Sequence, residues 1–409
     1  LERQKIIDEL AEIEREIADL KDILAREDRQ RQIVHDELAE IVDKYGDERR
    51  TEIIPATGDV TDEDLIAREN VVVTITSTGY AKRTKVDSYK AQKRGGKGVR
   101  GAELKQDDIV KNFFVCSTHD WILFFTNFGR VYRLKAYELP EAGRAARGQH
   151  VANLLEFQPE EKIAQVIQIQ SYEDAPYLVL ATQQGRVKKS RLTDYESARS
   201  AGLIAINLNE GDALIGAQLV SEGDDILLTS EQGQAIRFTA DDDQLRPMGR
   251  ATAGVKGMRF RGDDQLLSMS VVHDGEFLLV ATSGGYGKRT AIEEYTTQGR
   301  GGLGVMTFKY TPKRGKLIGA ISVDEDDEIF AITSAGGVIR TEVDQIRPSS
   351  RATMGVRLVN LADDVELLAI DRNVEEDGEE DAQAVAKGEK TVDEVQQEHK
   401  AGDASKDEE

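Results

Sequence analysis

The sequence predicts a mainly β protein whose centre is a six-bladed, propeller-like disc, preceded by an α-helical segment and followed by an acidic tail. A hairpin pattern recurs six times, two series of glycines share one period, and the two ends of the chain differ in composition from the repeats. A sheet repeated in this way is typical of a propeller with one sheet per blade. We therefore divide the 409 residues into a helical segment (1–50), a linker (51–68), the repeat region (69–370) and a disordered acidic tail (371–409).

The N-terminal segment has the apolar spacing of a coiled-coil helix. Six apolar residues recur at alternating intervals of four and three, which is the a/d pattern of a coiled coil. A second helix is expected after a polar break at residues 27–29, with Val34, Leu38 and Ile41 on one face. The residues of the first apolar stripe are Ile6, Leu10, Ile13, Ile17, Leu20 and Leu24.

The linker contains a run of alternating oxygen-bearing side chains. Asp59, Thr61 and Glu63, followed by Glu69, have a spacing similar to that of the ligands in a calcium loop. The run departs from an EF-hand because Asp64 stands where glycine is expected and Glu69 comes one residue early. The alternative is a helix start, with Thr61 as the cap and acidic residues in the first turn. The sequence favours the helix start, and the four residues stay candidate Ca²⁺ ligands.

Each repeat consists of an apolar strand, a glycine turn and a strand rich in Lys or Arg, which indicates a β-hairpin. The turn glycines lie 48 to 56 residues apart: Gly79, Gly129, Gly185, Gly233, Gly285 and Gly337. A second series follows the first by 17 to 21 residues: Gly98, Gly148, Gly202, Gly254, Gly304 and Gly355. Because two independent markers share one period, each repeat is expected to carry a long loop at its second glycine.

The first of these loops carries a basic heptapeptide, QKRGGKG, at residues 92–98. Adjacent glycines let the backbone approach another molecule closely, and clustered cations suit a phosphate backbone better than base edges. The fifth loop is similar and contains Arg300, but it has Leu303 where the first has Lys97. The alternative is a basic surface turn; the place of the run within the repeats favours a binding loop. The candidate binding residues are Gln92, Lys93, Arg94, Gly95, Gly96, Lys97, Gly98 and Arg100.

The charge of the chain is unevenly distributed. The net charge of -22 comes from residues 1–66, with net -11, and residues 371–409, with net -10, so that residues 67–370 hold 39 basic and 40 acidic residues. A balanced domain can bind a polyanion where its cations cluster. The sequence predicts a circular basic track around the disc, and the alternative is ordinary solvated edge strands. The cations that follow the hairpin glycines are Lys82, Arg83, Arg130, Arg133, Lys188, Lys189, Arg237, Lys288, Arg289 and Arg340.

The six repeats and the intact heptapeptide resemble the C-terminal domain family of DNA gyrase A subunits, over residues 1 to about 370, and the heptapeptide matches the family's gyrase A box. The resemblance implies a β-pinwheel, in which neighbouring blades exchange strands. It also implies that double-stranded DNA is bound without sequence specificity, bent and wrapped with positive handedness around the rim. The N-terminal helices are similar to the end of the element that joins the family's cleavage domain to its pinwheel.

The resemblance further implies that this chain contributes no catalytic residue. The family's nucleophilic tyrosine and its partner arginine lie upstream of the sequence, and the fragment is not an enzyme by itself. It implies a part in ATP-dependent negative supercoiling by a type II topoisomerase, with the gyrase B protein and a second gyrase A protein in an A2B2 holoenzyme of the bacterial cytoplasm and nucleoid. ATP and Mg²⁺ belong to the rest of that assembly, and this chain requires no cofactor beyond the candidate Ca²⁺.

Two other interpretations stay open. The related A protein of topoisomerase IV has a degenerate box and often fewer blades, so that six units and an intact box favour gyrase. A propeller-type scaffold for protein interactions has no reason to concentrate QKRGGKG in one loop. A single cysteine, Cys116, leaves no internal disulfide and fits a reducing cytoplasm, and no membrane-spanning run is expected.

The C-terminal residues 371–409 are expected to be disordered, because they have few apolar side chains and many acidic ones. A solubilising tail is the simpler interpretation. The second interpretation is autoinhibition, in which the acidic tail competes with DNA for the basic rim.

Overall fold

The computed structural model describes residues 2–47, 62–89, 108–196, 202–335 and 337–402. Its contacts divide the chain into two compact units, residues 1–61 and 62–409. The first unit contains the two helices expected from the sequence, α1 (Glu2–Ala25) and α2 (Glu27–Tyr45). The predicted apolar stripe of α1 is solvent-exposed, with exposed fractions from 46% at Ile17 to 78% at Leu24.

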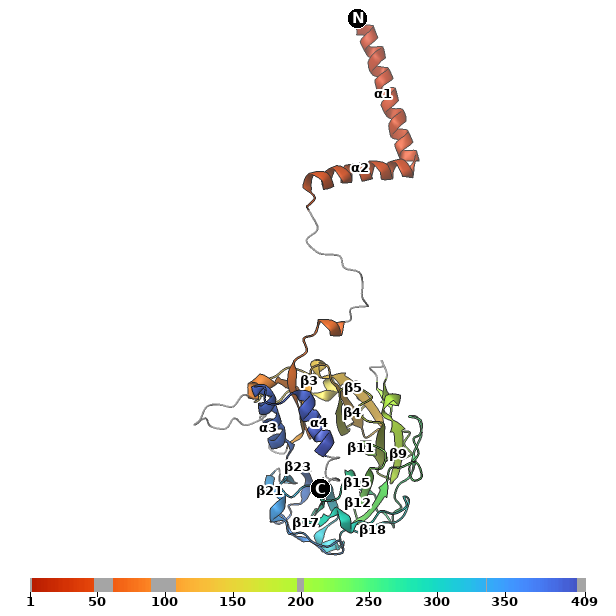
Figure 1. The fold of residues 1–409 in the computed structure, drawn as a ribbon. Coiled ribbons are helices and arrows are strands. Elements are labelled where there is room, and N and C mark those ends of the chain that lie inside the picture. The colour runs from red at the N-terminus through yellow and green to blue at the C-terminus, as the bar shows by residue number, and fades with distance from the viewer. Residues whose placement is uncertain (1, 48–61, 90–107, 197–201, 336, 403–409) are drawn as a thin grey trace. The chain divides into compact units, whose positions relative to one another are not determined.

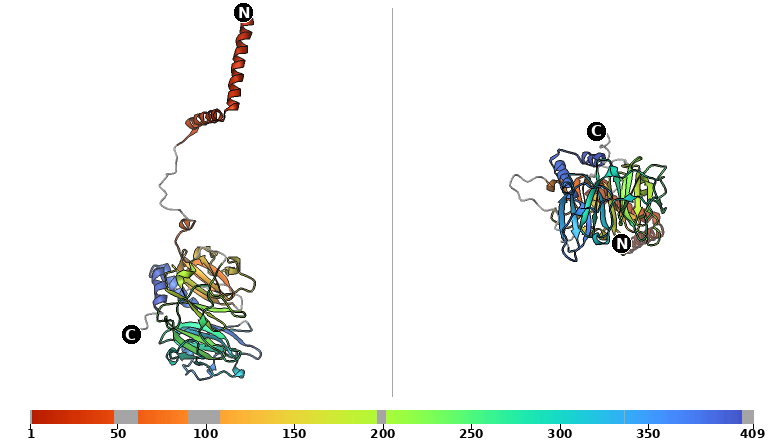
Figure 2. Two further views of the ribbon diagram at one scale, coloured as in Figure 1. Left: turned by 90° about the vertical axis from the view of Figure 1, so that its right-hand side faces the viewer. Right: turned by 90° about the horizontal axis from the view of Figure 1, so that it is seen from below.

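The second unit is a ring of six antiparallel sheets, which confirms the predicted six-bladed β fold (Figures 1 and 2). The strands of each sheet are given in hydrogen-bonding order from the inner strand outward. The first sheet is β3 (Val110–Ser117), β1 (Asn70–Thr76), β2 (Tyr80–Lys85) and β6 (Gln149–His150), and the second is β7 (Ile163–Ile169), β4 (Trp121–Thr126), β5 (Arg130–Lys135) and β10 (Leu203–Ile204). The third is β11 (Leu214–Val220), β8 (Tyr177–Thr182), β9 (Arg186–Arg191) and β14 (Val255–Lys256), and the fourth is β15 (Leu266–Val272), β12 (Asp225–Ser230), β13 (Gln234–Thr239) and β18 (Val305–Met306). The fifth is β19 (Leu317–Val323), β16 (Phe277–Thr282), β17 (Tyr286–Ala291) and β22 (Val356–Arg357), and the sixth is β23 (Leu367–Arg372), β20 (Glu328–Thr333) and β21 (Val338–Glu342).

Neighbouring blades exchange a strand, as the pinwheel resemblance implied. In each of the first five sheets, three long strands come from one repeat and the two-residue outer strand comes from the next repeat. The pairing has the same register throughout: Ala81 pairs with Gln149 in the first sheet, as Val187 pairs with Val255 in the third. In the described residues the sixth sheet has three strands, and the segment after Gly98 that corresponds to the exchanged strands lies outside those residues.

The core consists of apolar layers between the sheets, because alternate side chains of each strand point to opposite faces. Val71 and Val73 of β1 pack against Ile122 and Phe124 of β4. The intervening Val72 points to the other face of the first sheet, where it meets a different set of apolar residues. Short 3₁₀ helices follow five of the hairpins: η2 (Val86–Tyr89), η3 (Ala136–Glu138), η5 (Leu192–Tyr195), η6 (Ile292–Glu294) and η8 (Val343–Gln345). Others precede the first hairpin or follow an exchanged strand: η1 (Asp62–Leu65), η4 (Val151–Asn153) and η7 (Pro312–Arg314).

The prediction of a disordered tail is wrong for residues 374–402, which contain the helices α3 (Val374–Lys387) and α4 (Val392–Gly402). Both helices pack on the first blade beside β3 (Figure 1). The buried apolar residues of the tail are spaced three apart within each helix, and the blade supplies the rest of the core, including Val72 and Phe113. The buried tail residues are Ala382, Val385, Val392 and Val395.

Polar contacts also fix the tail helices to the first two blades. The Glu379 carboxylate lies 2.5 Å from the Arg144 guanidinium, and the Gln396 amide donates to the Val115 carbonyl at 3.2 Å. The Gln170 amide donates to Asp393 at 2.7 Å. The acidic composition of this segment therefore does not make it disordered, because the blades supply hydrogen-bond and ion-pair partners for its polar side chains.

Val395→Ala is expected to destabilise the second unit by about 2 kcal/mol, because it removes two buried methyl groups and leaves a cavity. Val395 is 2% exposed, between α4 and the first blade. The matched control Val356→Ala, in the outer strand β22 at a 44% exposed position, is expected to cost less than about 1 kcal/mol. Urea unfolding followed by circular dichroism measures both values, and equal losses would show that α4 is not part of the core.

Candidate nucleic-acid interface

The candidate interface is the outer edge of the ring, where a loop precedes each exchanged strand. We call rim loops the described segments that end at a glycine of the second series: residues 143–148, 249–254, 299–304 and 350–355. Their terminal glycines have φ values from +67° to +85°. A Cβ atom on any of them would lie 2.3–2.5 Å from a carbonyl oxygen of the preceding repeat's strand. Glycine therefore allows each rim loop to lie directly on that strand.

Three buried lysines hold the rim loops from beneath. The Lys82 ammonium donates to the carbonyls of Gly143, at 3.2 Å, and Ala146, at 2.8 Å, and also to that of Arg144. The Lys188 ammonium donates to the carbonyls of Arg250 and, at 2.5 Å, Ala205. The third ammonium, of Lys288, donates to the Ser350 carbonyl at 2.7 Å, the Arg351 carbonyl at 2.5 Å and the Thr353 hydroxyl at 3.2 Å.

The predicted basic track is wrong for five of its members, whose side chains lie in the interior and not on the rim. Their exposed fractions are at most 2%, and the rim loop and exchanged strand of the next repeat cover the strand that carries them. A buried charge is tolerated where it is paired and hydrogen-bonded, and the Lys189 ammonium donates to the Ala240 carbonyl at 2.7 Å. The five buried members of the predicted track are Lys82, Lys188, Lys189, Lys288 and Arg289.

Apart from Arg340, the remaining arginines of the predicted track, together with Arg300 of the fifth loop, are half-buried and bound to the protein. Two of them donate to carboxylates: Arg83 to Glu141, and also to the Leu139 carbonyl, and Arg237 to Asp225 and Asp274. The others donate to neutral acceptors: Arg130 to the Gly202 carbonyl, Arg133 to the Tyr172 hydroxyl and Arg300 to the Lys256 carbonyl. Arg340 is exposed, 3.6 Å from Glu328. The structure therefore keeps some of these guanidinium groups near the surface but assigns each of them a protein partner as well.

Burial changes the acid–base behaviour of the interior lysines. Desolvation, and after it the charge of Arg250, lower the pKa of Lys188 to about 7, while the charge of Asp194 opposes the shift. Desolvation likewise lowers the pKa of Lys288 to about 8, opposed by Glu294. A neutral amine keeps two N–H donors, so that Lys188 can satisfy its two carbonyls in either protonation state.

Sequence reasoning missed a series of arginines that the structure places in the rim loops. They lie four residues before the second glycine, as Arg94 lies before Gly98 and Arg300 before Gly304. Alignment of the repeats on the second glycine, and not on the hairpin glycine, would have found them. In the other described rim loops they are Arg144, Arg250 and Arg351.

Aromatic rings lie close to the guanidinium groups of several rim arginines. The Arg147 guanidinium carbon lies 3.5 Å from the centroid of the Tyr80 ring, and Arg314 and Arg357 lie 4.2 and 5.0 Å from the Tyr286 ring. Stacking of a guanidinium on a ring fixes its plane while its N–H edges stay available for other acceptors. Cations on or shortly after the exchanged strands, and two shortly before the rim loops, are exposed as well: Lys256, Arg259, Lys309 and Arg357, and Arg246 and Arg347.

Several predicted site residues lie outside the described residues. They include the calcium candidates Asp59 and Thr61. They also include all the predicted binding residues of the first loop: Gln92, Lys93, Arg94, Gly95, Gly96, Lys97, Gly98 and Arg100. The chain enters this segment from η2, where Tyr89 is buried against Phe113 and lies under the Arg144 guanidinium at 4.3 Å. It leaves at Asp108, whose carboxylate accepts hydrogen bonds from the Ser77 and Thr78 hydroxyls, at 2.8 and 2.6 Å. Both ends of the segment are therefore anchored in the first blade.

The two described candidates for calcium ligation face different cations. Glu63 lies 2.9 Å from the Lys135 ammonium, and Glu69 lies 3.1 Å from that of Lys85. The segment contains the 3₁₀ helix η1, as the helix-start alternative predicts. A Ca²⁺ site that includes Asp59 and Thr61 stays a prediction.

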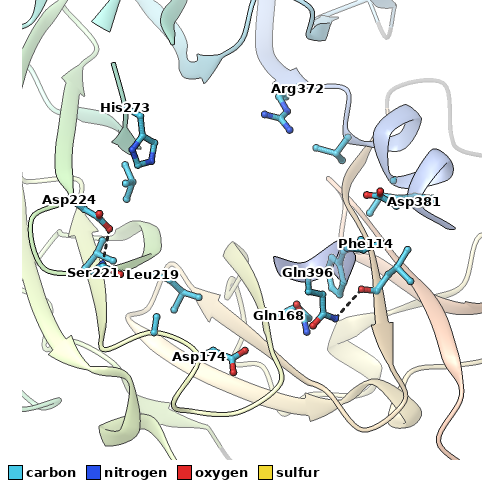
Figure 3. A pocket seen from close by; sticks show the side chains of 18 residues that line it. Phe114, Gln168, Asp174, Leu219, Ser221, Asp224, His273, Arg372, Asp381 and Gln396 are labelled. Carbon is cyan, nitrogen blue, oxygen red and sulfur yellow. Dashed lines mark hydrogen bonds between the residues drawn. The ribbon is translucent and has the colours of Figure 1, made fainter. Parts of the chain in front are cut away.

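The inner side of the ring is less suited to DNA than the rim. A central cavity of about 420 Å³ is bounded by the inner strands and the tail helices, with Asp174, Asp224 and Asp381 among its lining residues (Figure 3). Gln396 and Arg372 line it as well. Carboxylates repel phosphate, and a duplex whose major groove alone is about 12 Å wide does not fit such a volume. The rim is therefore the surface that the geometry offers to a polyanion.

The chain is similar to known proteins in both sequence and fold. The sequence profile of the DNA gyrase C-terminal domain, beta-propeller, matches residues 70–117, 120–170, 176–221, 224–273, 276–324 and 327–373, one match for each blade. The DNA gyrase A protein of Mycolicibacterium smegmatis is 70% identical over 377 residues, which cover 92% of this chain and 45% of that protein. The corresponding protein of Streptomyces coelicolor is 60% identical over 380 residues, 92% of this chain and 44% of that one.

Two solved structures have a similar fold. The C-terminal domain of DNA topoisomerase IV has a TM-score of 0.70 at 27% identity, covering 79% of this chain and 99% of that one. The DNA gyrase A C-terminal domain has a TM-score of 0.57 at 29% identity, covering 74% and 99%. The chain spans about half the length of the curated relatives it matches. Among the described residues, no helix is long and apolar enough to span a membrane. From the profile matches to all six blades and the 70% identity, the chain belongs to the DNA gyrase C-terminal domain, beta-propeller family.

Proposed function

We propose that this domain binds double-stranded DNA along its outer rim, without sequence specificity, and bends the duplex around the ring. The observation that carries the proposal is the repeated arginine four residues before the second glycine, in loops that the ring distributes along its outer edge. Arginine and backbone N–H groups in glycine-rich loops are suited to phosphate oxygens. Among the described residues, the rim presents no helix or two-stranded ribbon that would enter a major groove to read bases.

The cost of bending explains why contacts on many blades are needed. Bending 20 to 30 base pairs by 40 to 90° costs about 1 to 6 kcal/mol, so that a wrap around several blades requires many phosphate contacts. Each contact releases counterions, and the summed contribution falls as salt rises. The heptapeptide, with its extra cations, would fix one end of the wrapped DNA, and its residues Gln92 to Gly98 and Arg100 stay the primary candidates.

We further propose that the domain serves the activity for which its relatives are named. The M. smegmatis and S. coelicolor relatives are DNA gyrase A proteins. In such an enzyme the wrapped DNA would be presented to the remainder of an A2B2 holoenzyme, with the gyrase B protein supplying ATP hydrolysis, in the cytoplasm and on the nucleoid. A topology assay on the reconstituted holoenzyme separates this function, which is negative supercoiling, from the decatenation expected of a topoisomerase IV.

The double variant K256Q/R357Q tests the rim directly. Both residues are the second residue of an exchanged strand, and both are exposed. If each contacts one phosphate, the slope of log K against log salt becomes less steep by about 1.8, at about 0.9 per contact. The slope is measured by fluorescence anisotropy with a linear duplex.

The matched control is K111Q/K162Q, which removes two exposed lysines on or beside the inner strands β3 and β7. It lowers the net charge by the same amount and is expected to leave the slope unchanged. Equal slopes for the two double variants would mean that total charge, and not the rim, determines binding.

A further inference from the structure

We propose that Lys82, Lys188 and Lys288 are positioning residues: each holds the rim loop of the next repeat in the conformation that presents its arginine, and does not itself contact DNA. The proposal rests on the function proposed above. It assigns these lysines a role opposite to the one that their sequence positions suggested, since they act from the inside of the blade.

The three lysines make the same connection in three blades. Each stands three residues after the hairpin glycine, and each donates to the carbonyl of the arginine that stands four residues before the second glycine of the next repeat. The recipients are the carbonyls of Arg144, Arg250 and Arg351. A neighbouring carbonyl or hydroxyl completes each set. Because the contact recurs with the repeat, it belongs to the architecture of the loop and is not an accident of packing.

Burial shows that the lysines act on the loops and are not available to DNA. Their exposed fractions are 2% for Lys82 and 0% for Lys188 and Lys288. A position that only filled space would be apolar, and at the same place the fourth blade has Ile236 and the second has Tyr132. An ammonium is kept in such a site where the carbonyls around it need a donor.

The fourth blade shows what holds a rim loop when the lysine is absent. Next to Ile236, the loop 299–304 is fixed instead by the Arg300 side chain, which donates to the carbonyls of Gln244 and Lys256. In that loop the arginine is engaged by the protein scaffold. In two of the loops that a lysine holds from beneath, the arginine makes fewer contacts with the protein: Arg250 donates to the Asp194 carbonyl and Arg351 to the Met306 carbonyl. Arg144 differs, because its guanidinium pairs with Glu379 of α3 and lies over the Tyr89 ring. Lys188 and Lys288 thus leave the arginine side chains of their loops available for another acceptor.

The test compares Lys188→Met and Lys288→Met with Lys111→Met in the full chain. Each change replaces an amine with the same thioether, but Lys111 is exposed on β3 and lies outside the three contacts. Hydrogen exchange followed by mass spectrometry, without DNA, is expected to accelerate by about tenfold or more in residues 249–254 for the first variant and 350–355 for the second, and in neither segment for the control. Unchanged exchange in both segments of folded variants would overturn the proposal.

DNA measurements then distinguish positioning from contact. In Lys188→Met, end-to-end FRET on a linear duplex is expected to report less bending. The double variant K188M/R250Q is expected to have the same slope of log K against log salt as R250Q alone, because Lys188 acts only through the Arg250 loop. A slope that is less steep by about 0.9 more in the double variant would identify Lys188 as a phosphate ligand and overturn the proposal. Lys188→Gln, whose amide keeps two N–H donors, is expected to restore slow exchange and most of the bending, and it carries the test if the methionine variant does not fold.

Failure of the proposed function gives a separate result. If the wild-type chain does not bend DNA, the proposed function is wrong, whereas the exchange comparison still decides whether the lysines hold the loops.

Discussion

Replacing Lys93, Arg94 and Lys97 with Ala is expected to abolish DNA bending by this chain while leaving its fold intact. The three residues supply the cations of the heptapeptide, and Arg94 occupies the position of the recurring rim-loop arginine. The described residues on either side of the segment, Tyr89 and Asp108, are anchored in the first blade. End-to-end FRET on a linear duplex measures the change.

So large an effect is expected because the proposed bending would be all-or-none along the rim. Contacts on later blades would form only when the duplex already follows the curve, and the elastic energy of about 1 to 6 kcal/mol for each 20 to 30 base pairs would oppose every step. Without a clamp at one end, partial wraps lose more in elastic energy than their few contacts return. Residual straight binding would persist, with a salt slope less steep by up to about 2.7 for three lost contacts.

The control for this prediction removes three exposed lysines that lie off the rim loops, in the variant K85A/K111A/K162A. It changes the net charge equally and is expected to keep the FRET amplitude of the wild type. Full bending by the triple heptapeptide variant would show that the remaining rim cations suffice, and the clamp would then have to be abandoned.

The six-bladed ring could be predicted from the sequence because glycines recur with the period of the blades. Gly148 and Gly254 need positive φ and room for a neighbouring carbonyl, and no other residue supplies both. The exchange of strands could not be read in the same way, since each exchanged strand is only two residues long, as in Val255–Lys256. Such a short segment has no periodicity, and its partner lies in a different repeat.

The position of the buried lysines shows the limit of repeat arithmetic. The spacing placed Lys82, Lys188 and Lys288 at equivalent points of their blades, which is correct. Charge then suggested exposure, although the covering rim loop comes from the next repeat and its carbonyls are invisible in a sequence. Equivalence fixes where a residue lies around the ring but not whether another segment covers it.

The tail illustrates the same difficulty from the opposite side. Residues 371–409 contain too few apolar side chains to build a core of their own, so that composition predicted disorder. Ala382, Val385, Val392 and Val395 instead complete a core whose other members, such as Phe113 and Val72, belong to the first blade. A segment that borrows its core from another part of the chain cannot be recognised from its own composition.

Gly254→Ala is expected to destabilise the second unit by about 3 kcal/mol. The loss has two sources, the positive φ of this glycine and the close approach of the rim loop to β9. With φ at +69°, any L side chain costs about 1 kcal/mol or somewhat more at this position. The added Cβ would also lie 2.4 Å from the Val187 carbonyl oxygen and 3.0 Å from the Lys188 Cβ, so that the loop must move off β9. Forcing a side chain into a closely packed site typically costs a further 1 to 3 kcal/mol or so.

Gly211→Ala is the matched control, because Gly211 has nearly the same φ, +70°, with no atom within 4 Å of the place that a Cβ would occupy. It carries the conformational cost alone and is expected to lose about 1 kcal/mol. Urea unfolding measures the free energy of unfolding of both variants. The difference between the two losses is the cost of placing a methyl group between the rim loop and β9. If the two losses are equal, the loop is free to retreat from β9, and the contact from Lys188 to Arg250 does not hold it in place. If Gly254→Ala loses the larger amount and also bends DNA less, the approach that admits only glycine is the same one that positions the arginine.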